Sequence, residues 1–359
     1  MARFIANGYN GEVLGDLLTY TAQGNDTYNE GLIHIQSGIE YKYTIPNIKL
    51  GSIIQDNVPT PTSTAYAAGG GAGADGASNN YTITQRYLMP TNFMVYMEFN
   101  PRDYEKYWKP FQPNGNLVFR DLAPAVQSTM LRLLMEEKAK YVGEAIWCSA
   151  LGGTAASGIT APAGGTAIGG QADGGPMKYF DGVIKRLITN LSATSGDADQ
   201  NEFLGGQVVL AGSTVLSTGQ NVNDALYTMF QKCPKQIRKN ANLSFVMDWA
   251  TWDLYDEYMS AKENKYYDNT QINQYRFKGK RIIPIVGIPE STIMFTVFSQ
   301  GMDSNLWMGV DYANDEEVVK IAPLQANSEL YFFQMRMKMD VNIVRPAEIV
   351  LWTPYTKTA

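Results

Sequence analysis

One short glycine-rich segment has the residue pattern of a dinucleotide-binding loop. Residues 66–81 read YAAGGGAGADGASNNY, and residues 71–76 within them, GAGADG, match G-x-G-x-x-G. Such a loop binds a pyrophosphate where a strand precedes it and a helix begins within it, because the phosphate rests on the helix N-terminus. Here Pro59 and Pro61 precede the motif, and the strand-like sequence NYTITQRYL follows it. The context therefore predicts a flexible turn between two strands and no cofactor.

The other side chains that could do chemistry form no recognisable site. His34 is the only histidine, which excludes a multi-histidine metal site and leaves a Ser-His-Asp triad only if His34 itself serves. It has no nucleophile beside it, so we interpret it as a structural residue near a strand. Cys148 and Cys233 form no C-x-x-C motif and predict no disulfide framework, as in a protein made in a reducing compartment. The acidic residues 311–317 lack the spacing of a calcium loop and are typical of a solvated turn. We therefore predict no catalytic residue and no bound metal, and no enzyme.

Composition and charge restrict the partners of the chain. Of its 359 residues, 45% are hydrophobic and 18% are charged, as in a folded protein with two or three packed lobes. The formal net charge is -6 and no basic stripe is evident, which argues against gripping nucleic acid through its phosphates. The apolar runs are far shorter than a membrane span, so no membrane partner is expected. The 22 tyrosines suit extensive interfaces, and they equally suit a strand-rich protein.

Alternating side chains predict a long hairpin around the glycine-rich segment. Apolar and polar residues alternate from Ile39 to Ile45, and again from Tyr81 to Tyr87 and from Phe93 to Phe99. This period of two is typical of half-buried strands. A hairpin is unstable alone, so its apolar face needs a cover from the body of the chain or from a neighbouring subunit.

A long helix and an α/β lobe are predicted next. Residues 121–148 indicate one helix of about 42 Å, with Asp121 as its N-cap and Pro124 in its first turn. Shorter elements then follow in this order: a helix near 177–191, a strand at 206–212, a helix at 224–232, a strand at 243–247 and a helix from Asp248. We interpret residues 206–287 as a compact α/β lobe with the order β-α-α-β-α-β.

The last third of the chain is rich in strands, among them RIIPIVG, STIMFTVFS, NLWMGVDY, EEVVKIAP and AEIVLW. Residues 331–343 show the sharpest alternation. One face carries Tyr331, Phe333, Met335, Met337, Met339, Val341 and Ile343. The other face begins at Phe332 and continues with Gln334, Arg336, Lys338, Asp340 and Asn342. This pattern predicts a strand with one buried and one solvated face.

This order of elements resembles the major capsid proteins of tailed double-stranded DNA phages, which have the Hong Kong 97-type fold. MARFIANGYNG is similar to the N-arm of that fold, GIEYKYTIPNIK through YTITQRYLMPTNFMVYMEF to its E-loop hairpin, and DLAPAVQSTMLRLLMEEKAKYVGEAIW to its spine helix. NANLSFVMDWATWDLYDEYMSAKE, RIIPIVGIPESTIMFTVFS and NLWMGVDYANDEE are similar to its axial domain. ELYFFQMRMKMDVNIVRP is similar to the strand that returns to the peripheral domain.

The resemblance covers nearly the whole chain and implies an α+β fold in five parts. These are an N-terminal arm at 1–36, the E-loop hairpin at 37–108, a peripheral domain with the spine helix at 109–204, an axial α/β domain at 205–321, and the returning strands of the peripheral domain at 322–359.

The resemblance also implies a function. The chain is expected to form hexamers and pentamers of an icosahedral phage head, which encloses double-stranded DNA without sequence-specific binding. Scaffold, portal and decoration proteins are possible partners, and the location is the virion after assembly in the host cytoplasm. The expected assembly residues lie at the E-loop tip and along the strand that follows it: Tyr66, Gly69, Gly71, Gly73, Asp75, Gly76, Tyr81 and Arg86.

Two departures from the family pattern and two rival functions stay open. Some members have a long N-terminal scaffolding segment, whereas about 36 residues precede the hairpin here, so a separate scaffold or prior removal is possible, although Met1 argues against removal. Some members cross-link through a lysine at the hairpin tip, and residues 65–81 contain none, which argues against cross-linking. The rivals are an encapsulin-like nanocompartment shell and a tyrosine-rich β surface binding module.

Overall fold

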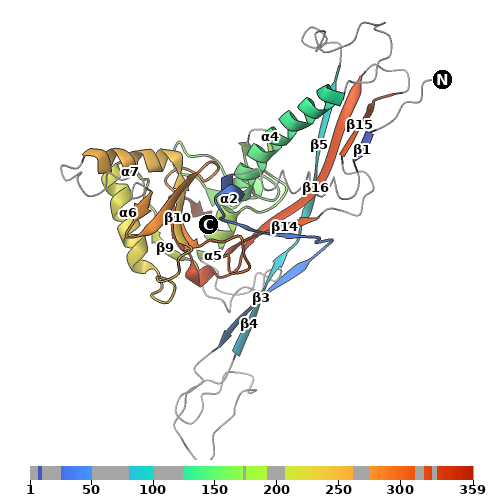
Figure 1. Cartoon of the computed structure of the whole chain (residues 1–359). Helices are drawn as coiled ribbons and strands as arrows, with labels where there is room; N and C mark the ends of the chain where they lie inside the picture. The colour runs from blue at the N-terminus through green and yellow to red at the C-terminus, as the bar shows by residue number, and fades with distance from the viewer. Residues whose placement is uncertain are drawn as a thin grey trace, which may run out of the picture.

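A computed structural model of the chain shows an elongated molecule (Figure 1). A lobe of helices and strands lies at one end, long strands run beside helix α4 (Pro124–Cys148), and a hairpin projects in another direction. The structure describes residues 7–9, 26–50, 81–100, 124–172, 175–191, 207–261, 275–311, 319–325 and 330–358.

The hairpin consists of β3 (Tyr43–Leu50) and β4 (Tyr81–Leu88). The two strands are antiparallel, with Tyr43 opposite Leu88 and Leu50 opposite Tyr81. The strand predicted at Tyr81–Tyr87 is therefore confirmed, whereas the one predicted at Ile39–Ile45 runs instead from Tyr43 to Leu50, after Gly38 (φ 76°) has turned the chain. The glycine-rich tip between the strands lies outside the described residues.

Strand β16 (Tyr331–Ile343) organises the first sheet, which we call the long-strand sheet. Its order is β1-β15-β16-β14-β2, and β5 pairs with β16 as well. The other strands are β1 (Asn7–Tyr9), β2 (His34–Ser37), β5 (Thr91–Phe99), β14 (Leu306–Asp311) and β15 (Val319–Pro323). Because β16 has 13 residues, its edge is about 43 Å long and offers room for both β15 and β14.

Helix α4 covers one face of the long-strand sheet with the second half of its length. The apolar face predicted for β16 is confirmed, because Phe333, Met335, Met337 and Met339 are all buried. Met337 and Met339 share one core with the apolar residues of α4 from Tyr141 to Cys148. The helix has 25 residues and is about 37 Å long, close to the predicted length.

The second sheet, here called the lobe sheet, has the order β11-β12-β10-β13-β17-β9. Its strands are β9 (Val209–Gly212), β10 (Leu243–Asp248), β11 (Arg276–Phe277), β12 (Lys280–Ile285), β13 (Ile293–Val297) and β17 (Val350–Trp352). Helices α6 (Gly219–Lys232) and α7 (Trp249–Ala261) lie against this sheet. Gly219 allows the two helices to touch, because a Cβ there would lie 2.1 Å from the carbonyl oxygen of Leu254.

Short elements complete the fold. Helix α5 (Val183–Leu191) packs between α4 and β16. The remaining elements are α2 (Asp26–Asn29), η2 (Thr154–Ala156), β6 (Ile159–Thr160), β7 (Gln171–Ala172), β8 (Gly175–Pro176), η5 (Pro346–Glu348) and β18 (Thr356–Lys357).

Several strands pair with strands that the sequence assigns to another part of the chain. Residues 91–99, placed in the hairpin segment, form β5 and pair with β16. Strands β14 and β15, expected in or at the end of the axial domain, belong to the long-strand sheet, while β17 from the returning segment joins the lobe sheet. A single helix, α6, separates β9 from β10, as expected from the helix at 224–232, whereas the order β-α-α-β-α-β placed two helices there. Alternation identifies a strand and its buried face, but hydrogen-bonding partners far away in sequence decide its sheet.

Candidate functional site

The hairpin leaves the body of the molecule at a packed root, which we define as residues 38–45 and 86–90 with the side chains that hold them. A separate apolar cluster lies there, formed by Ile39, Ile45, Leu88, Trp307 and Val344, with Tyr43 against it. Gly309 of β14 lies beneath this cluster. A Cβ at Gly309 would be 2.8 Å from Ile39 Cδ1 and 3.2 Å from Leu88 Cβ, so the missing side chain lets the root approach β14 closely.

His34 and Trp307 support the root from β2 and β14. The two rings lie 4.3 Å apart, and His34 Nδ1 donates to the carbonyl oxygen of Gln300 at 2.7 Å. The Trp307 indole donates to the carbonyl oxygen of Ser304 at 3.0 Å. These contacts agree with the structural role expected for His34.

A buried ion pair lies directly under the point where the hairpin joins β5. Asp340 of β16 is 3% exposed, and its Oδ1 accepts from Arg186 Nη2 of α5 at 2.8 Å. Its Oδ2 accepts from the backbone N–H of Met89 at 2.8 Å. Burial raises the pKa of Asp340, while Arg186 and the N–H groups of Met89 and Val341 act in the opposite direction. The carboxylate thus joins helix, sheet and hairpin at one point.

Arg86 provides a second polar link between the hairpin and α5. Its guanidinium Nη2 donates to Asn190 Oδ1 at 3.2 Å, and Asn190 Nδ2 in turn donates to the carbonyl oxygen of Arg186 at 2.7 Å. Asn342 of β16 adds a third link, because its Nδ2 donates to the carbonyl oxygen of Tyr87 at 2.8 Å. Arg86 is 2% exposed and Asn342 is fully buried, so water does not compete for these bonds.

The structure places only part of the expected assembly site. Six of its residues lie outside the described residues: Tyr66, Gly69, Gly71, Gly73, Asp75 and Gly76. Tyr81 begins β4 at the end of the hairpin that is far from the body. Arg86 lies at the opposite end of β4, buried in the root. The structure therefore does not bring Tyr81 and Arg86 together.

Sequence reasoning missed four residues of the root: Arg186, Asn190, Asp340 and Asn342. The last two were assigned to the solvated face of β16, and this assignment is wrong, because both are buried beneath the hairpin. One signal existed in the spacing of Arg186 and Asn190, which are four residues apart and so share one face of a helix. Nothing local connects that face to β16.

The face of the long-strand sheet opposite α4 exposes apolar and aromatic side chains. Met94 is 53% exposed and Tyr96 is 48% exposed. The Tyr96 ring stacks on Phe332 at 6.0 Å, and Gln334 Nε2 contacts Met94 Sδ at 3.2 Å. We call Met94, Tyr96, Phe332 and Gln334 the outer patch. Exposed aromatic side chains of this kind are common where proteins contact one another.

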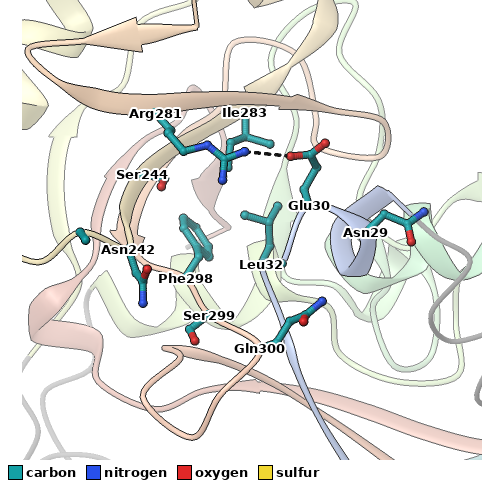
Figure 2. A pocket seen from close by; sticks show the side chains of 12 residues that line it. Asn29, Glu30, Leu32, Asn242, Ser244, Arg281, Ile283, Phe298, Ser299 and Gln300 are labelled. Atoms are coloured by element: carbon teal, nitrogen blue, oxygen red, sulfur yellow. Dashed lines mark hydrogen bonds and ion pairs between the residues drawn. The ribbon is translucent and has the colours of Figure 1, made fainter. Parts of the chain in front are cut away.

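A polar pocket of about 480 Å³ lies between the segment after α2 and the lobe sheet (Figure 2). Its floor contains Leu32, Ile283 and Phe298, and an ion pair between Arg281 and Glu30 (3.2 Å) crosses its rim. Both charged side chains are about half exposed, so this pair contributes little to stability. Ser244 and Ser299 also line the pocket.

The burial of Cys148 and the grouping of metal-binding side chains bear on the chemistry of the described residues. Burial raises the pKa of Cys148 to about 12, so its thiol stays protonated and unreactive near neutral pH. Among the described residues, no three His, Cys, Asp or Glu side chains are grouped to hold a metal ion. Within that same part of the chain, no helix has the length and apolar character needed to cross a membrane.

Solved phage capsid structures have this arrangement of elements. A chain of the satellite phage P4 procapsid, which includes the size determination (Sid) protein, matches with a TM-score of 0.56 and 11% identity over 97% of this chain and 92% of its own. The capsid of cyanophage A-1(L) matches with a TM-score of 0.53 and 11% identity over 100% of this chain and 98% of its own. This chain has the fold of these phage capsid proteins. The capsid of Myoviridae phage XM1 matches at 0.50 and 10% identity, over 98% of this chain and 94% of its own.

The likeness in fold extends over nearly the whole chain, so it includes the hairpin, the long-strand sheet and the lobe. No protein-family model and no curated protein sequence matches the chain. At 10–11% identity the likeness concerns the fold. The roles of individual residues therefore come from the contacts of this chain.

Proposed function

We propose that this chain is the major capsid protein of a tailed double-stranded DNA phage, and that it assembles into an icosahedral shell. One observation supports this most strongly: a phage-capsid fold over the whole chain carries a hairpin that projects from the body. Among the described residues, β3 and β4 pair only with each other. A two-stranded hairpin of this kind is marginal alone and needs a second surface.

The parts of the Hong Kong 97-type fold can be assigned to the described elements. The hairpin corresponds to the E-loop, the long-strand sheet with α4 to the peripheral domain and its spine helix, and the lobe sheet with α6 and α7 to the axial domain. Residues 1–36 correspond to the N-arm, within which the structure describes β1, α2 and most of β2. The order of elements along the chain supports this assignment.

The hairpin of one subunit and the outer patch of the next can cover each other. The hairpin requires a cover, and the outer patch exposes Met94 and Tyr96 to solvent in the single subunit. A contact between two different surfaces of identical chains is heterologous, and it produces closed rings when the rotation between neighbours closes. Hexamers and pentamers are such rings. The glycines of the hairpin tip would give the backbone freedom to fit each neighbour.

The shell would contain DNA without reading its sequence. The formal net charge of -6 supports this view, because a protein that grips phosphates presents a basic surface. Scaffold, portal and decoration proteins are expected partners, the virion is the expected location, and the host cytoplasm is the expected place of assembly. No catalytic step is assigned to the chain.

The test is to express the full chain and examine the product by analytical ultracentrifugation and negative-stain electron microscopy. Closed particles that contain DNA when recovered from infected or induced cells support the proposal. Closed particles that contain a defined protein cargo would indicate an encapsulin-like shell instead. A stable, compact monomer that binds a small ligand saturably would replace the shell function with that of a surface binding module.

A further inference from the structure

The hairpin root contains more polar contacts than a simple strand connection needs. Three side chains from two elements of the body reach the hairpin backbone or its Arg86 side chain: Asp340 and Asn342 from β16 and Asn190 from α5. Arg186 joins the two elements, because it pairs with Asp340 through its side chain and accepts from Asn190 through its carbonyl oxygen. We call this set of contacts the root clamp.

The burial of the root clamp makes it sensitive to small movements. The side chains of Arg186 and Asp340 are 12% and 4% exposed, so water cannot replace their partners easily. Met89 N lies 2.8 Å from Asp340 Oδ2, and a displacement of about 1 Å would break this hydrogen bond. The backbone N–H of Met89 is the first donor after the last residue of β4, so it would move when the hairpin pivots.

The apolar part of the root restricts the same movement from the other side. Ile39 and Leu88 rest on the bare Cα of Gly309, and Trp307 stacks with Tyr43 at 6.4 Å. The hairpin is therefore held between β14 on one side and α5 with β16 on the other. Each of these elements belongs to the body of the same subunit.

The hairpin acts as a lever on this root. From Tyr43 to Leu50 it extends about 23 Å, and a pivot of about 10° at the root moves its far end by about 4 Å. Side chains that are packed against a neighbouring chain lose contact with it after a shift of that size. The angle at the root therefore determines where a neighbour can be engaged.

We infer that the root clamp holds the hairpin at one angle within each subunit, before any neighbour binds, and that this angle sets the curvature with which subunits join. The second part rests on the proposed shell function, whereas the first part concerns the single subunit. The residues that carry the inference are Arg86, Arg186, Asn190, Asp340 and Asn342.

The angle can be measured by the distance between two spin labels on the full chain. One label is placed at Lys49→Cys, near the far end of β3, and the other at Gln231→Cys, an exposed position on α6. The native Cys148 and Cys233 are 4% and 2% exposed, and the chain without added cysteines shows whether they label. Labelled chains are diluted with an excess of unlabelled chain, so that only distances within one subunit are recorded.

Two clamp variants and one matched control are compared. Asn190→Ala removes one hydrogen-bond partner of Arg86. The double variant Arg186→Met/Asp340→Asn replaces the ion pair by neutral groups and leaves neither charge of the pair behind. The control is Lys185→Met, at the neighbouring position of the same helix, where the lysine pairs with Asp181 at 2.7 Å and does not contact the hairpin. Circular dichroism confirms that each variant is folded.

The wild-type chain and Lys185→Met should give one narrow distance distribution, and both clamp variants should give a broadened or shifted one. Clamp variants that keep the narrow wild-type distribution would overturn the first part of the inference. Particles formed by the clamp variants should also vary in diameter more than wild-type particles. Wild-type diameters in spite of a broadened distance distribution would overturn the second part. If the wild-type chain forms no particles at all, the proposed shell function is wrong. The distance measurement still tests whether the root clamp fixes the angle of the hairpin.

Discussion

Replacing Lys138 of α4 by methionine should stabilise the subunit, because this lysine is a buried cation. Its side chain is 6% exposed, and its ammonium group donates to the thioether sulfur of Met335 at 3.0 Å. A thioether is a weak acceptor. In the described part of the chain, no carboxylate pairs with Lys138. Burial lowers the pKa of this group from 10.5 to about 7.

The size and sign of the effect follow from this pKa. The unfolded chain binds a proton at Lys138 up to about pH 10.5, whereas the folded subunit releases it near pH 7, so the unfolded state binds more protons between these values. Stability therefore rises with pH across this window, by at most about 1.4 kcal/mol per pH unit. At pH 7 the K138M variant should exceed the wild-type free energy of unfolding by about 2–4 kcal/mol, and this advantage should shrink as the pH increases.

The assay is urea unfolding of unassembled subunits at pH 7, 8 and 9, and the difference between variant and wild type isolates Lys138 from other titrating groups. Lys140→Met is the matched control, because Lys140 lies two positions along α4, is 65% exposed and pairs with Glu137 at 3.5 Å. An exposed pair of this kind contributes at most about 1 kcal/mol, so the control should change little. A K138M variant that is less stable than wild type at pH 7, or whose advantage does not fall with pH, would refute the reasoning.

Other changes test the remaining parts of the structure. Leu88→Ala should lower the free energy of unfolding by about 2–5 kcal/mol, because Leu88 is fully buried in the root, whereas Tyr41→Ala, at an 81% exposed position, should stay within about 0.5 kcal/mol. If the two variants lost equal free energy of unfolding in chemical denaturation, this would contradict the burial of Leu88 in the root. Gly309→Ala should cost about 1–3 kcal/mol by crowding Ile39 and Leu88, and a neutral result would show that the root can shift. The Cys148 thiol should resist a thiol reagent below pH 9 until the subunit unfolds, since burial raises its pKa to about 12, and rapid labelling of the folded protein would argue against its burial. Shortening the tip at residues 66–80 should leave folding intact and alter assembly or particle stability, and a misfolded monomer would place the tip in the core.

Local periodicity was sufficient to predict most elements of the fold. The strands of the hairpin, helix α4 and the buried face of β16 all follow from side chains that repeat every two or every three to four residues. The sheet that each strand joins could not be predicted from this periodicity. Strand β17 joins the lobe sheet, although it comes shortly after β16 in the chain. Pairing of this kind depends on contacts between residues that lie far apart in sequence.

The candidate site was harder to predict than the fold. Asp340 and Arg186 are separated by 154 positions, and no local pattern connects them. Asp340 also stands in an alternating run where a charged residue indicates a solvated face. The hairpin root and α5, both distant in sequence, lie against it in the fold. The expected site at the hairpin tip is largely outside the described residues, so its role in assembly stays a prediction.

We propose that this chain builds a closed shell in which each hairpin contacts the next subunit. A cryo-electron microscopy reconstruction of particles assembled from the full chain tests it most directly. We expect an icosahedral shell of hexamers and pentamers, with β3 and β4 of one subunit against the outer patch around Tyr96 of its neighbour. A shell in which the hairpin contacts no other subunit, or a chain that remains monomeric under all assembly conditions, would contradict it.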